Sequence, residues 1–429
     1  MDTIFALSSG APPAAIAVMR ISGPDAFAAF GRLSVGRLPP AHDARVRVLR
    51  DPRDETPLDR ALVLAFPAPR TATGEDLVEL HLHGGRAVVR AVEAALEAMP
   101  GLRRAEAGEF TRRALTNGRI DLAEAEGLGD LLSAETELQR RAAMAVADGG
   151  LSRDVARWRE RLLMLAARIE AALDFSDEID VAADQALLAG IRVEMAAVAG
   201  EIATALAAPR SERLRDGIKV VLAGPPNSGK STLLNAMIGR DAAIVSPIAG
   251  TTRDRIEIAV AREGIPFVLT DTAGLRDDSK DAIERIGIAR TAQAMATADL
   301  IVWLGDAEPE ESEALWIHAR SDVAGRETMP KGPSLRVSAE TGTGISDLWD
   351  LLLKRARTMI PGPNDAVLNA RQAALCGEAL AALADSESDD ELIVADALRR
   401  ANAQLARITG DIGIEDTLDA LFARFCIGK

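Results

Sequence analysis

The sequence contains no tyrosine, only two cysteines and no long apolar run. Two cysteines are too few for a disulfide framework, which fits a reducing cytoplasm. No segment approaches the roughly 20 consecutive apolar residues of a membrane-spanning helix, and the N-terminus lacks the basic and apolar regions of a signal peptide. These absences predict a cytoplasmic protein with no membrane partner.

Basic and aromatic residues are also few. The 65 acidic residues outnumber the 50 basic ones, so the formal net charge is −15, and aromatic residues make up 3% of the chain. An acidic surface repels phosphate backbones at long range, and few aromatic rings leave few platforms for base stacking. We therefore expect any nucleic-acid function to need a local basic patch or a basic partner protein.

The 429 residues exceed the usual size of one hydrophobic core, so two or three domains are expected. Short β-like runs and an Ala-rich helix near 86–98 predict a compact α+β domain over residues 1–118. Apolar residues at helical spacing predict long amphipathic helices in about 121–210, and helix returns at about 366–408.

Strands and helices alternate in the intervening residues 213–363, which is typical of a parallel, doubly wound sheet. Strands are expected at 218–222, 267–269 and 300–304. Isolated helices bury little apolar surface. We therefore expect residues 119–212 and 364–429 to form one helical domain into which the α/β domain is inserted.

The most specific motif is a phosphate-binding loop. Residues 224–231 match G-x-x-x-x-G-K-[S/T], after the expected strand 218–222 and before an expected helix at 232–238. The glycines allow successive backbone N–H groups to turn toward phosphate oxygens, and the helix N-terminus adds a positive dipole. We expect Lys230 on the β- and γ-phosphates and the Ser231 hydroxyl on Mg²⁺.

Two further motifs stand in the order that a GTPase needs. Asp271 ends a strand and begins Asp-Thr-Ala-Gly, so its carboxylate would hold the Mg²⁺ shell through water, and the N–H of Gly274 would reach the γ-phosphate. Residues 250–254 read Gly-Thr-Thr-Arg-Asp, in which a threonine can close over Mg²⁺ and γ-phosphate. Together the three motifs predict a GTP-hydrolysing G domain.

The base-reading motif is reduced. The usual Asn-Lys-x-Asp is expected after the strand 300–304, and the best candidate is Ala-Arg-Ser-Asp at 319–322, followed by Ser338 and Ala339. Asp322 can accept hydrogen bonds from the guanine N1 and N2 donors. Since Ala319 cannot supply the amide of an asparagine, we expect guanine preference with weakened affinity for the base.

Hydrolysis also needs a substitute for a missing glutamine. Leu275 follows Asp-Thr-Ala-Gly, and an aliphatic side chain cannot orient the attacking water as the glutamine of Ras-type proteins does. The amide oxygen of Asn227 could coordinate a monovalent cation along the phosphates, which would neutralise transition-state charge. Taken alone, Asn227 is equally well explained as a turn-forming residue.

The whole chain resembles the tRNA-modification GTPases called MnmE or TrmE. The resemblance rests on the G domain with its Gly-Thr-Thr-Arg-Asp motif and on the highly specific Cys-Ile-Gly-Lys at 426–429. The N-terminal part carries further matching motifs at 20–24, 73–76, 83–85 and 108–111. The resemblance implies a multidomain α/β protein in which a Ras-like P-loop G domain is inserted in an α-helical domain, preceded by an α+β tetrahydrofolate-binding domain that forms a homodimer.

The resemblance also implies an activity. In this family the G domains meet across the dimer when K⁺ binds, and this activates hydrolysis. The reaction adds an aminomethyl or carboxymethylaminomethyl group to C5 of the wobble uridine of certain tRNAs. The one-carbon donor is a tetrahydrofolate derivative, in the 5,10-methylene or 5-formyl form. A FAD-dependent partner, MnmG, carries the flavin and much of the tRNA contact, and the two proteins form a heterotetramer.

Site residues follow from the resemblance position by position. Catalytic roles fall to Lys230 and to Glu284, the acid that orients the water through a second water. K⁺ would be held by Asn227, Ser246, Ile248 and Thr251, and Mg²⁺ by Ser231 and Thr252. The GTP-binding residues would be Asn227, Ser228, Gly229, Lys230, Ser231, Thr232, Ser246, Thr251, Thr252, Asp271, Thr272, Ala273, Gly274, Asp322, Ser338 and Ala339.

A folate site is implied in the same way. It would comprise Arg20, Glu79, Arg119 and Lys429, with Cys426 near it as a possible reactive thiol. Arg119 stands where the family more often has lysine, so the charge persists with altered geometry. The alternative is a ribosome-assembly or regulatory GTPase without modification chemistry. The former usually carries a basic RNA-binding domain after the G domain, where this chain has acidic helices.

Overall fold

The computed structural model describes residues 2–34, 36–174, 181–239, 243–246, 257–271, 293–362, 367–384, 390–412, 421–422, 425 and 427–428. Two compact units are present, and each is described by itself. The first comprises residues 1–129, 147–159 and 403–429, and the second comprises 130–146 and 160–402. Among the described helices, none is both long and apolar enough to cross a membrane.

A six-stranded sheet forms the core of the first unit as far as it is described, in the order β3-β4-β5-β2-β1-β6. The strands are β1 (Thr3–Leu7), β2 (Ile16–Ser22), β3 (Ala44–Arg50), β4 (Pro57–Phe66), β5 (Leu77–His83) and β6 (Leu102–Arg104). The β1–β6 pair is parallel, and the other neighbours are antiparallel. Helices α1 (Ala26–Leu33) and α2 (Arg86–Glu97) bury their apolar faces against this sheet. The predicted α+β fold is confirmed.

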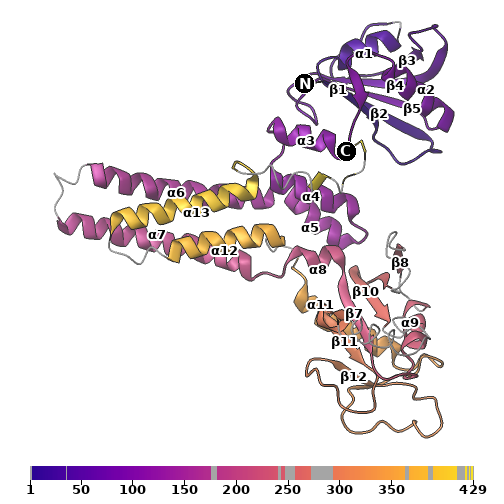
Figure 1. The fold of residues 1–429 in the computed structure, drawn as a ribbon, viewed down its shortest axis with the longest axis vertical. Coiled ribbons are helices and arrows are strands. Elements are labelled where there is room, and N and C mark those ends of the chain that lie inside the picture. Colours follow the sequence, from indigo (N-terminus) through magenta and orange to yellow (C-terminus); the bar gives the residue numbers. More distant parts are fainter. Residues whose placement is uncertain are drawn as a thin grey trace, which may run out of the picture. The chain divides into compact units, whose positions relative to one another are not determined.

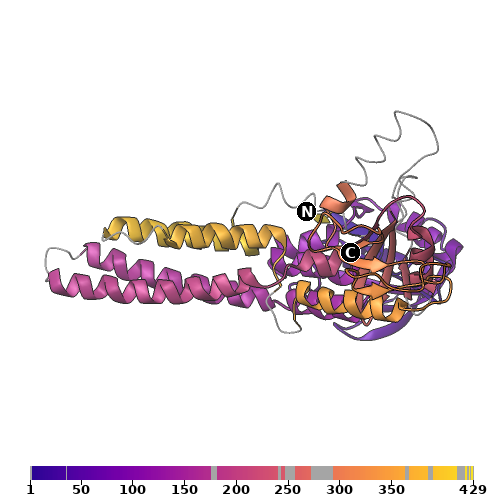
Figure 2. The same ribbon diagram turned by 90° about the horizontal axis from the view of Figure 1, so that it is seen from below.

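The short helix α3 (Glu109–Thr116) follows the sheet. Helices then fill the predicted ranges. They are α4 (Leu122–Ser133), α5 (Glu137–Ala147), α6 (Gly150–Asp174), α7 (Val181–Ala207), α12 (Ala370–Ala384) and α13 (Glu391–Thr409). Figure 1 shows α6, α7, α12 and α13 along one another, and in Figure 2 the gold helices, which overlap in that view, lie along the purple pair α6 and α7. Helix α12 contacts α7. Helices from before and after the α/β domain therefore form one helical domain with the α/β domain inserted.

The predicted return to helix over about 366–408 is confirmed, and the structure divides it into two helices, α12 and α13. Asp390 begins the second helix by accepting a hydrogen bond from the Leu392 N–H at 2.9 Å, which is an N-terminal cap. Cys376 lies fully buried on α12, and burial raises the pKa of its thiol to about 11. This cysteine is therefore protonated and unreactive at neutral pH.

The inserted domain has a seven-stranded sheet in its described part, in the order β13-β12-β11-β7-β10-β9-β8. The strands are β7 (Ile218–Ala223), β8 (Ala243–Ser246), β9 (Glu257–Arg262), β10 (Ile265–Asp271), β11 (Leu300–Trp303), β12 (Leu315–His318) and β13 (Leu335–Arg336). Helices α9 (Lys230–Gly239) and α11 (Ile345–Met359) contribute to its core, where Phe267 meets Trp349 edge to face.

The expected parallel pairing is confirmed from β13 through β10, but β8 and β9 form an antiparallel edge. The cause is the two-residue turn between β9 and β10. Glu263 and Gly264 have φ values of 49° and 78°. Positive φ at both central residues is the requirement of a tight hairpin turn, which reverses the chain direction.

The chain enters and leaves the inserted domain at neighbouring points. Helix α8 (Ser211–Asp216) precedes β7, and the Ser211 N–H donates to the carbonyl of Leu368 at 3.1 Å. The Ala370 N–H donates to Glu212 Oε1 at 2.5 Å. The segment that enters the inserted domain and the segment that leaves it are thus hydrogen bonded to each other, next to the start of α12.

Candidate functional site

The phosphate-binding loop joins the buried strand β7 to helix α9, as the sequence predicted. Gly224 has a φ of 147° and Gly229 a φ of 95°. A Cβ on Gly224 would lie 3.1 Å from Ser228 Oγ, so the loop is too tight for a side chain at that position. Lys230 is 6% exposed, and its Nζ donates to the carbonyls of Gly224 at 3.1 Å and Pro225 at 2.9 Å. The loop thus curls around the ammonium group.

Ser231 and Asp271 meet beside this loop. Asp271 ends β10, which pairs in parallel with β7, so both strands deliver their C-terminal residues to the same sheet edge. The Ser231 hydroxyl donates a hydrogen bond to Asp271 Oδ2, and Asp271 is 1% exposed. A hydroxyl and a carboxylate at one point form an oxygen-rich site of the kind that Mg²⁺ prefers.

Asp322 and Ser338 form a second polar pair. Ser338 is buried, and its Oγ donates to Asp322 Oδ1 at 2.5 Å. This hydrogen bond holds the pKa of the Asp322 carboxyl below its ordinary value, so the group is an ionised acceptor at neutral pH. Ala319, at the position where an asparagine was expected, is 4% exposed within the hydrophobic core of the domain.

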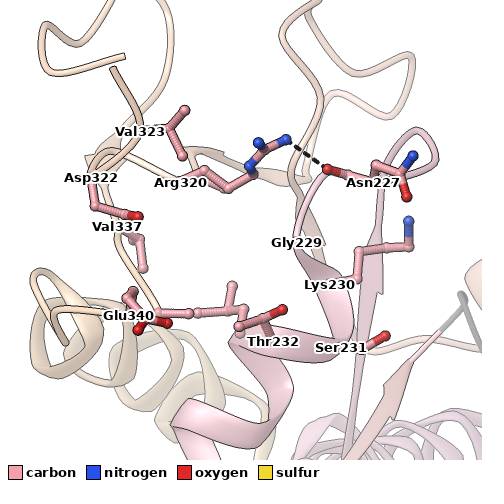
Figure 3. A pocket seen from close by; sticks show the side chains of 13 residues that line it. Asn227, Gly229, Lys230, Ser231, Thr232, Arg320, Asp322, Val323, Val337 and Glu340 are labelled. Carbon is pink, nitrogen blue, oxygen red and sulfur yellow. Dashed lines mark hydrogen bonds between the residues drawn. The ribbon is translucent and has the colours of Figure 1, made fainter. Parts of the chain in front are cut away.

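One cavity of about 450 Å³ joins the loop to Asp322 of the second polar pair (Figure 3). Its lining includes Asn227, Gly229, Lys230 and Ser231 on one side and Asp322 and Ala339 on the other. Cationic and backbone N–H groups at one end suit phosphates, while a carboxylate acceptor at the other suits a base with adjacent donors. This arrangement can hold a nucleotide.

Arg320 and Glu340 line the same cavity, although neither was among the expected site residues. Arg320 Nη1 donates to the backbone carbonyl of Asn227 at 2.8 Å, the dashed line in Figure 3. A signal was present, because Arg320 occupies the lysine position of the expected Asn-Lys-x-Asp. No sequence pattern pointed to Glu340.

Several expected site residues lie outside the described part of the chain. Ser246 ends β8, but its side chain is not described. The others outside the description are Ile248, Thr251, Thr252, Thr272, Ala273, Gly274, Glu284, Cys426 and Lys429. Their expected roles therefore stay predictions.

The expected folate residues are partly brought together in the first unit. Arg20 and Glu79 face each other on β2 and β5, and Arg20 Nη2 lies 2.7 Å from Glu79 Oε1. The Arg20 guanidinium also lies 5.7 Å from the centre of the Phe110 ring. The Nε of Arg119 donates to the carbonyl of Thr71 at 3.2 Å.

A cluster of ion pairs and hydrogen bonds around the buried Arg113 joins the N-terminal motifs at 20–24, 73–76 and 108–111 to one another. Arg113 is 8% exposed and donates to Asp2 at 2.7 Å, Glu109 at 3.0 Å and Glu75 at 3.1 Å. Ser22 donates to the same Glu75 at 2.8 Å. Burial raises the pKa of Glu109, but hydrogen bonds from Arg103 and Arg113 outweigh it and lower the pKa overall. Glu75 and Glu109, which lie in the motifs at 73–76 and 108–111, here have a structural role.

Replacing Arg113 by methionine is expected to lower the free energy of unfolding by about 3–5 kcal/mol, because buried carboxylates lose their cation. Chemical denaturation measures this, with Arg90→Met on the exposed face of α2 as a charge-matched control expected to change little. Since the pKa of Glu109 is lowered on folding, the cluster stabilises fully above the ordinary carboxyl pKa and loses its effect as the pH falls through the lowered value. If the difference in the free energy of unfolding between Arg113→Met and Arg90→Met persisted in acid, this account would be contradicted.

Comparisons with known proteins agree with this architecture. A family model described as the GTP-binding protein TrmE N-terminus matches residues 3–119, and one described as the MnmE helical domain matches residues 122–426. The chain is 56% identical over 431 residues to the tRNA modification GTPase MnmE of Erythrobacter litoralis, with 100% of both chains covered. Identity is 56% over 432 residues to that of Rhizorhabdus wittichii, covering 100% of this chain and 97% of the relative. For Novosphingobium aromaticivorans it is 53% over 442 residues, with 100% of both covered. The chain therefore belongs to the MnmE/TrmE family of tRNA-modification GTPases.

Proposed function

We propose that the chain is a K⁺-activated GTP hydrolase that works in a tRNA-modifying complex. With a FAD-dependent partner it would add (carboxymethyl)aminomethyl groups to C5 of the wobble uridine, using a tetrahydrofolate one-carbon donor. The observation that carries the proposal is the cavity joining the phosphate-binding loop to the ionised Asp322, in a chain that matches tRNA modification GTPases over its whole length.

Phosphate binding is assigned to the loop, and Mg²⁺ binding to Ser231 of the loop together with Thr252. Lys230 would exchange its contacts with the Gly224 and Pro225 carbonyls for β- and γ-phosphate oxygens. Ser231, together with Thr252, would hold Mg²⁺, which neutralises charge on the phosphates. The buried Asp271 carboxylate beside the Ser231 hydroxyl supports this assignment, because both oxygens suit a hard cation.

K⁺ binding is assigned to Asn227 and to the carbonyls of Ser246, Ile248 and Thr251. The Asn227 side chain lies on the same side of the loop as the Lys230 ammonium (Figure 3), next to the expected phosphate positions. An amide oxygen there can ligate a monovalent cation, which would supply charge that an arginine finger supplies in other GTPases. Glu284 is proposed to orient the attacking water in place of the missing glutamine.

Asp322→Asn is expected to convert guanine preference into xanthine preference. Asp322 would accept from guanine N1 and N2, and an asparagine amide would instead donate to the C2 carbonyl of xanthine. GTP affinity should fall by about 100-fold or more while XTP affinity exceeds it. Competition binding with both nucleotides measures this, and Asp350→Asn on α11 is the matched control. Unchanged GTP affinity would remove Asp322 as the base-reading group.

The N-terminal domain is proposed to bind the folate through Arg20, Glu79, Arg119 and Lys429, and to form the homodimer. The Arg20–Glu79 pair supports this, because a carboxylate and a guanidinium on one sheet face suit the donors of a pterin ring and the acidic tail of a folate. Cys426 would lie near this site as a possible reactive thiol. The proposed heterotetramer with MnmG, located in the cytoplasm, would receive most of its tRNA contact from the partner.

Two experiments test this proposal. The first measures wobble-uridine modification in tRNA from cells that lack the chain, with the intact chain supplied again as control. Loss of the modified nucleoside, and its return on complementation, is expected. The second measures tetrahydrofolate binding by the purified protein. Normal modification without the chain, or no folate affinity, would favour a ribosome-assembly or regulatory GTPase instead.

A further inference from the structure

The Arg320 side chain joins the segment after β12 to the phosphate-binding loop. Its Nη1 donates to the Asn227 carbonyl at 2.8 Å, although the two residues are 93 positions apart in the chain (Figure 3). The aliphatic stem packs on the same loop, since a Cβ placed on Gly229 would lie 3.2 Å from Arg320 Cγ and 3.5 Å from Cδ. Glycine at 229 is therefore what permits the contact.

Both ends of this hydrogen bond have unusual backbone conformations. Arg320 has a φ of 58° and Asn227 a φ of 59°, in the left-handed region that most non-glycine residues avoid. Such conformations persist where surrounding contacts over-determine them, and they concentrate at binding sites. A hydrogen bond to the Asn227 carbonyl fixes the peptide plane that follows Asn227. It therefore also restricts the direction in which the Asn227 amide leaves the loop.

The position of Arg320 links two parts of the cavity. Two residues after it in sequence is Asp322, the proposed base-reading group, and its own guanidinium reaches Asn227, the proposed cation ligand. Arginine suits this role because its planar guanidinium offers several fixed donors while the stem remains packed. A base that binds to Asp322 would order the segment that carries Arg320. Through the hydrogen bond from Arg320 it would also order the loop that carries Asn227.

We propose that Arg320 is a positioning residue that couples occupancy of the base site to binding of a monovalent cation at Asn227. The inference rests on the proposed function, because it takes Asn227 as a cation ligand. Coupling of this kind is reciprocal: the cation tightens nucleotide binding by the same factor by which the nucleotide tightens cation binding.

The test compares nucleotide affinities in KCl and NaCl at equal ionic strength, using a fluorescent, non-hydrolysable GTP analogue with Mg²⁺. Arg320→Met keeps the stem on Gly229 and removes the donor, whereas Arg320→Lys keeps a charged donor. The unmodified protein should bind about 10-fold more tightly in KCl. The ratio of the affinity in KCl to the affinity in NaCl should fall to within about twofold of unity in Arg320→Met, and it should recover in part in Arg320→Lys. The K⁺ concentration for half-maximal hydrolysis should rise by about 10-fold in Arg320→Met.

The matched control is Arg357→Met on α11, which removes the same charge from a pair with Glu263 outside the cavity and should keep the normal ratio. Arg320→Gln, too short to reach the carbonyl, repeats the loss if the methionine variant is unstable. If Arg320→Met weakened nucleotide binding equally in KCl and in NaCl, the ratio of the two affinities would not change. Arg320 would then be a nucleotide contact only, and the proposal would be overturned. If instead the unmodified protein itself showed no preference for K⁺ in binding or hydrolysis, the proposed function would fail together with this inference.

Discussion

Replacing Glu284 by alanine is expected to lower kcat for GTP hydrolysis by about 100- to 1000-fold while leaving GTP affinity almost unchanged. Leu275 follows the Asp-Thr-Ala-Gly motif, and an aliphatic group cannot align a water for attack on the γ-phosphate. A carboxylate that aligns this water acts mainly in the transition state, so its removal lowers kcat rather than binding.

Single-turnover hydrolysis at saturating K⁺ separates the chemical step from product release, and equilibrium binding of a GTP analogue reports affinity. Asp281→Ala, three positions earlier in the chain, is a charge-matched control expected to keep normal kcat. A Glu284→Ala variant with normal single-turnover rate would reject the water-orienting role. A loss of affinity equal to the loss of kcat/KM would instead assign Glu284 to nucleotide binding.

Replacing Asn227 is expected to abolish K⁺ stimulation of hydrolysis, because the cation loses a side-chain oxygen next to the phosphates. The stimulation in the unmodified protein should be at least about 10-fold, as for other electrostatic groups at a transferring phosphoryl group. Alanine at a φ of 59° is also strained, which would confuse the result.

Asn227→Gly removes that ambiguity, since glycine adopts the left-handed conformation without strain and lacks the amide. The glycine and alanine variants should both hydrolyse GTP at the same rate in KCl and NaCl, while Asn227→Asp, which keeps a side-chain oxygen, should retain some stimulation. K⁺ stimulation that survives in Asn227→Gly would remove Asn227 from the ligand set.

Local sequence patterns predicted the phosphate-binding part of the nucleotide site. The strand, glycine loop and helix around Lys230 are contiguous, so their geometry follows from residues that are neighbours in the chain. Asp271 could be placed because the C-terminal ends of neighbouring parallel strands share one edge. The Arg320–Asn227 contact depends on the packing of β12 against β11 and of β11 against β7, which no local pattern specifies.

Strand direction and helix ends were harder to predict. The strand β9 was not among the predicted strands, and its antiparallel direction is decided by the turn at Glu263 and Gly264. The separation of α12 from α13 had a signal in the polar run at 385–390, because Asp390 is a good N-terminal cap. In the first unit, neither the Arg113 cluster nor the contact of Arg119 with Thr71 could be derived, since both join segments far apart in the chain.

The hydrogen bonds between Ser211 and Leu368 and between Glu212 and Ala370 bear on how such a chain could arise. For the helical domain the whole inserted domain is a loop whose two ends already touch, so its length adds little closure entropy. A gene segment encoding a complete folded domain could have entered here without unfolding its host. For the same reason this junction is a suitable place to graft a foreign domain as a reporter or switch.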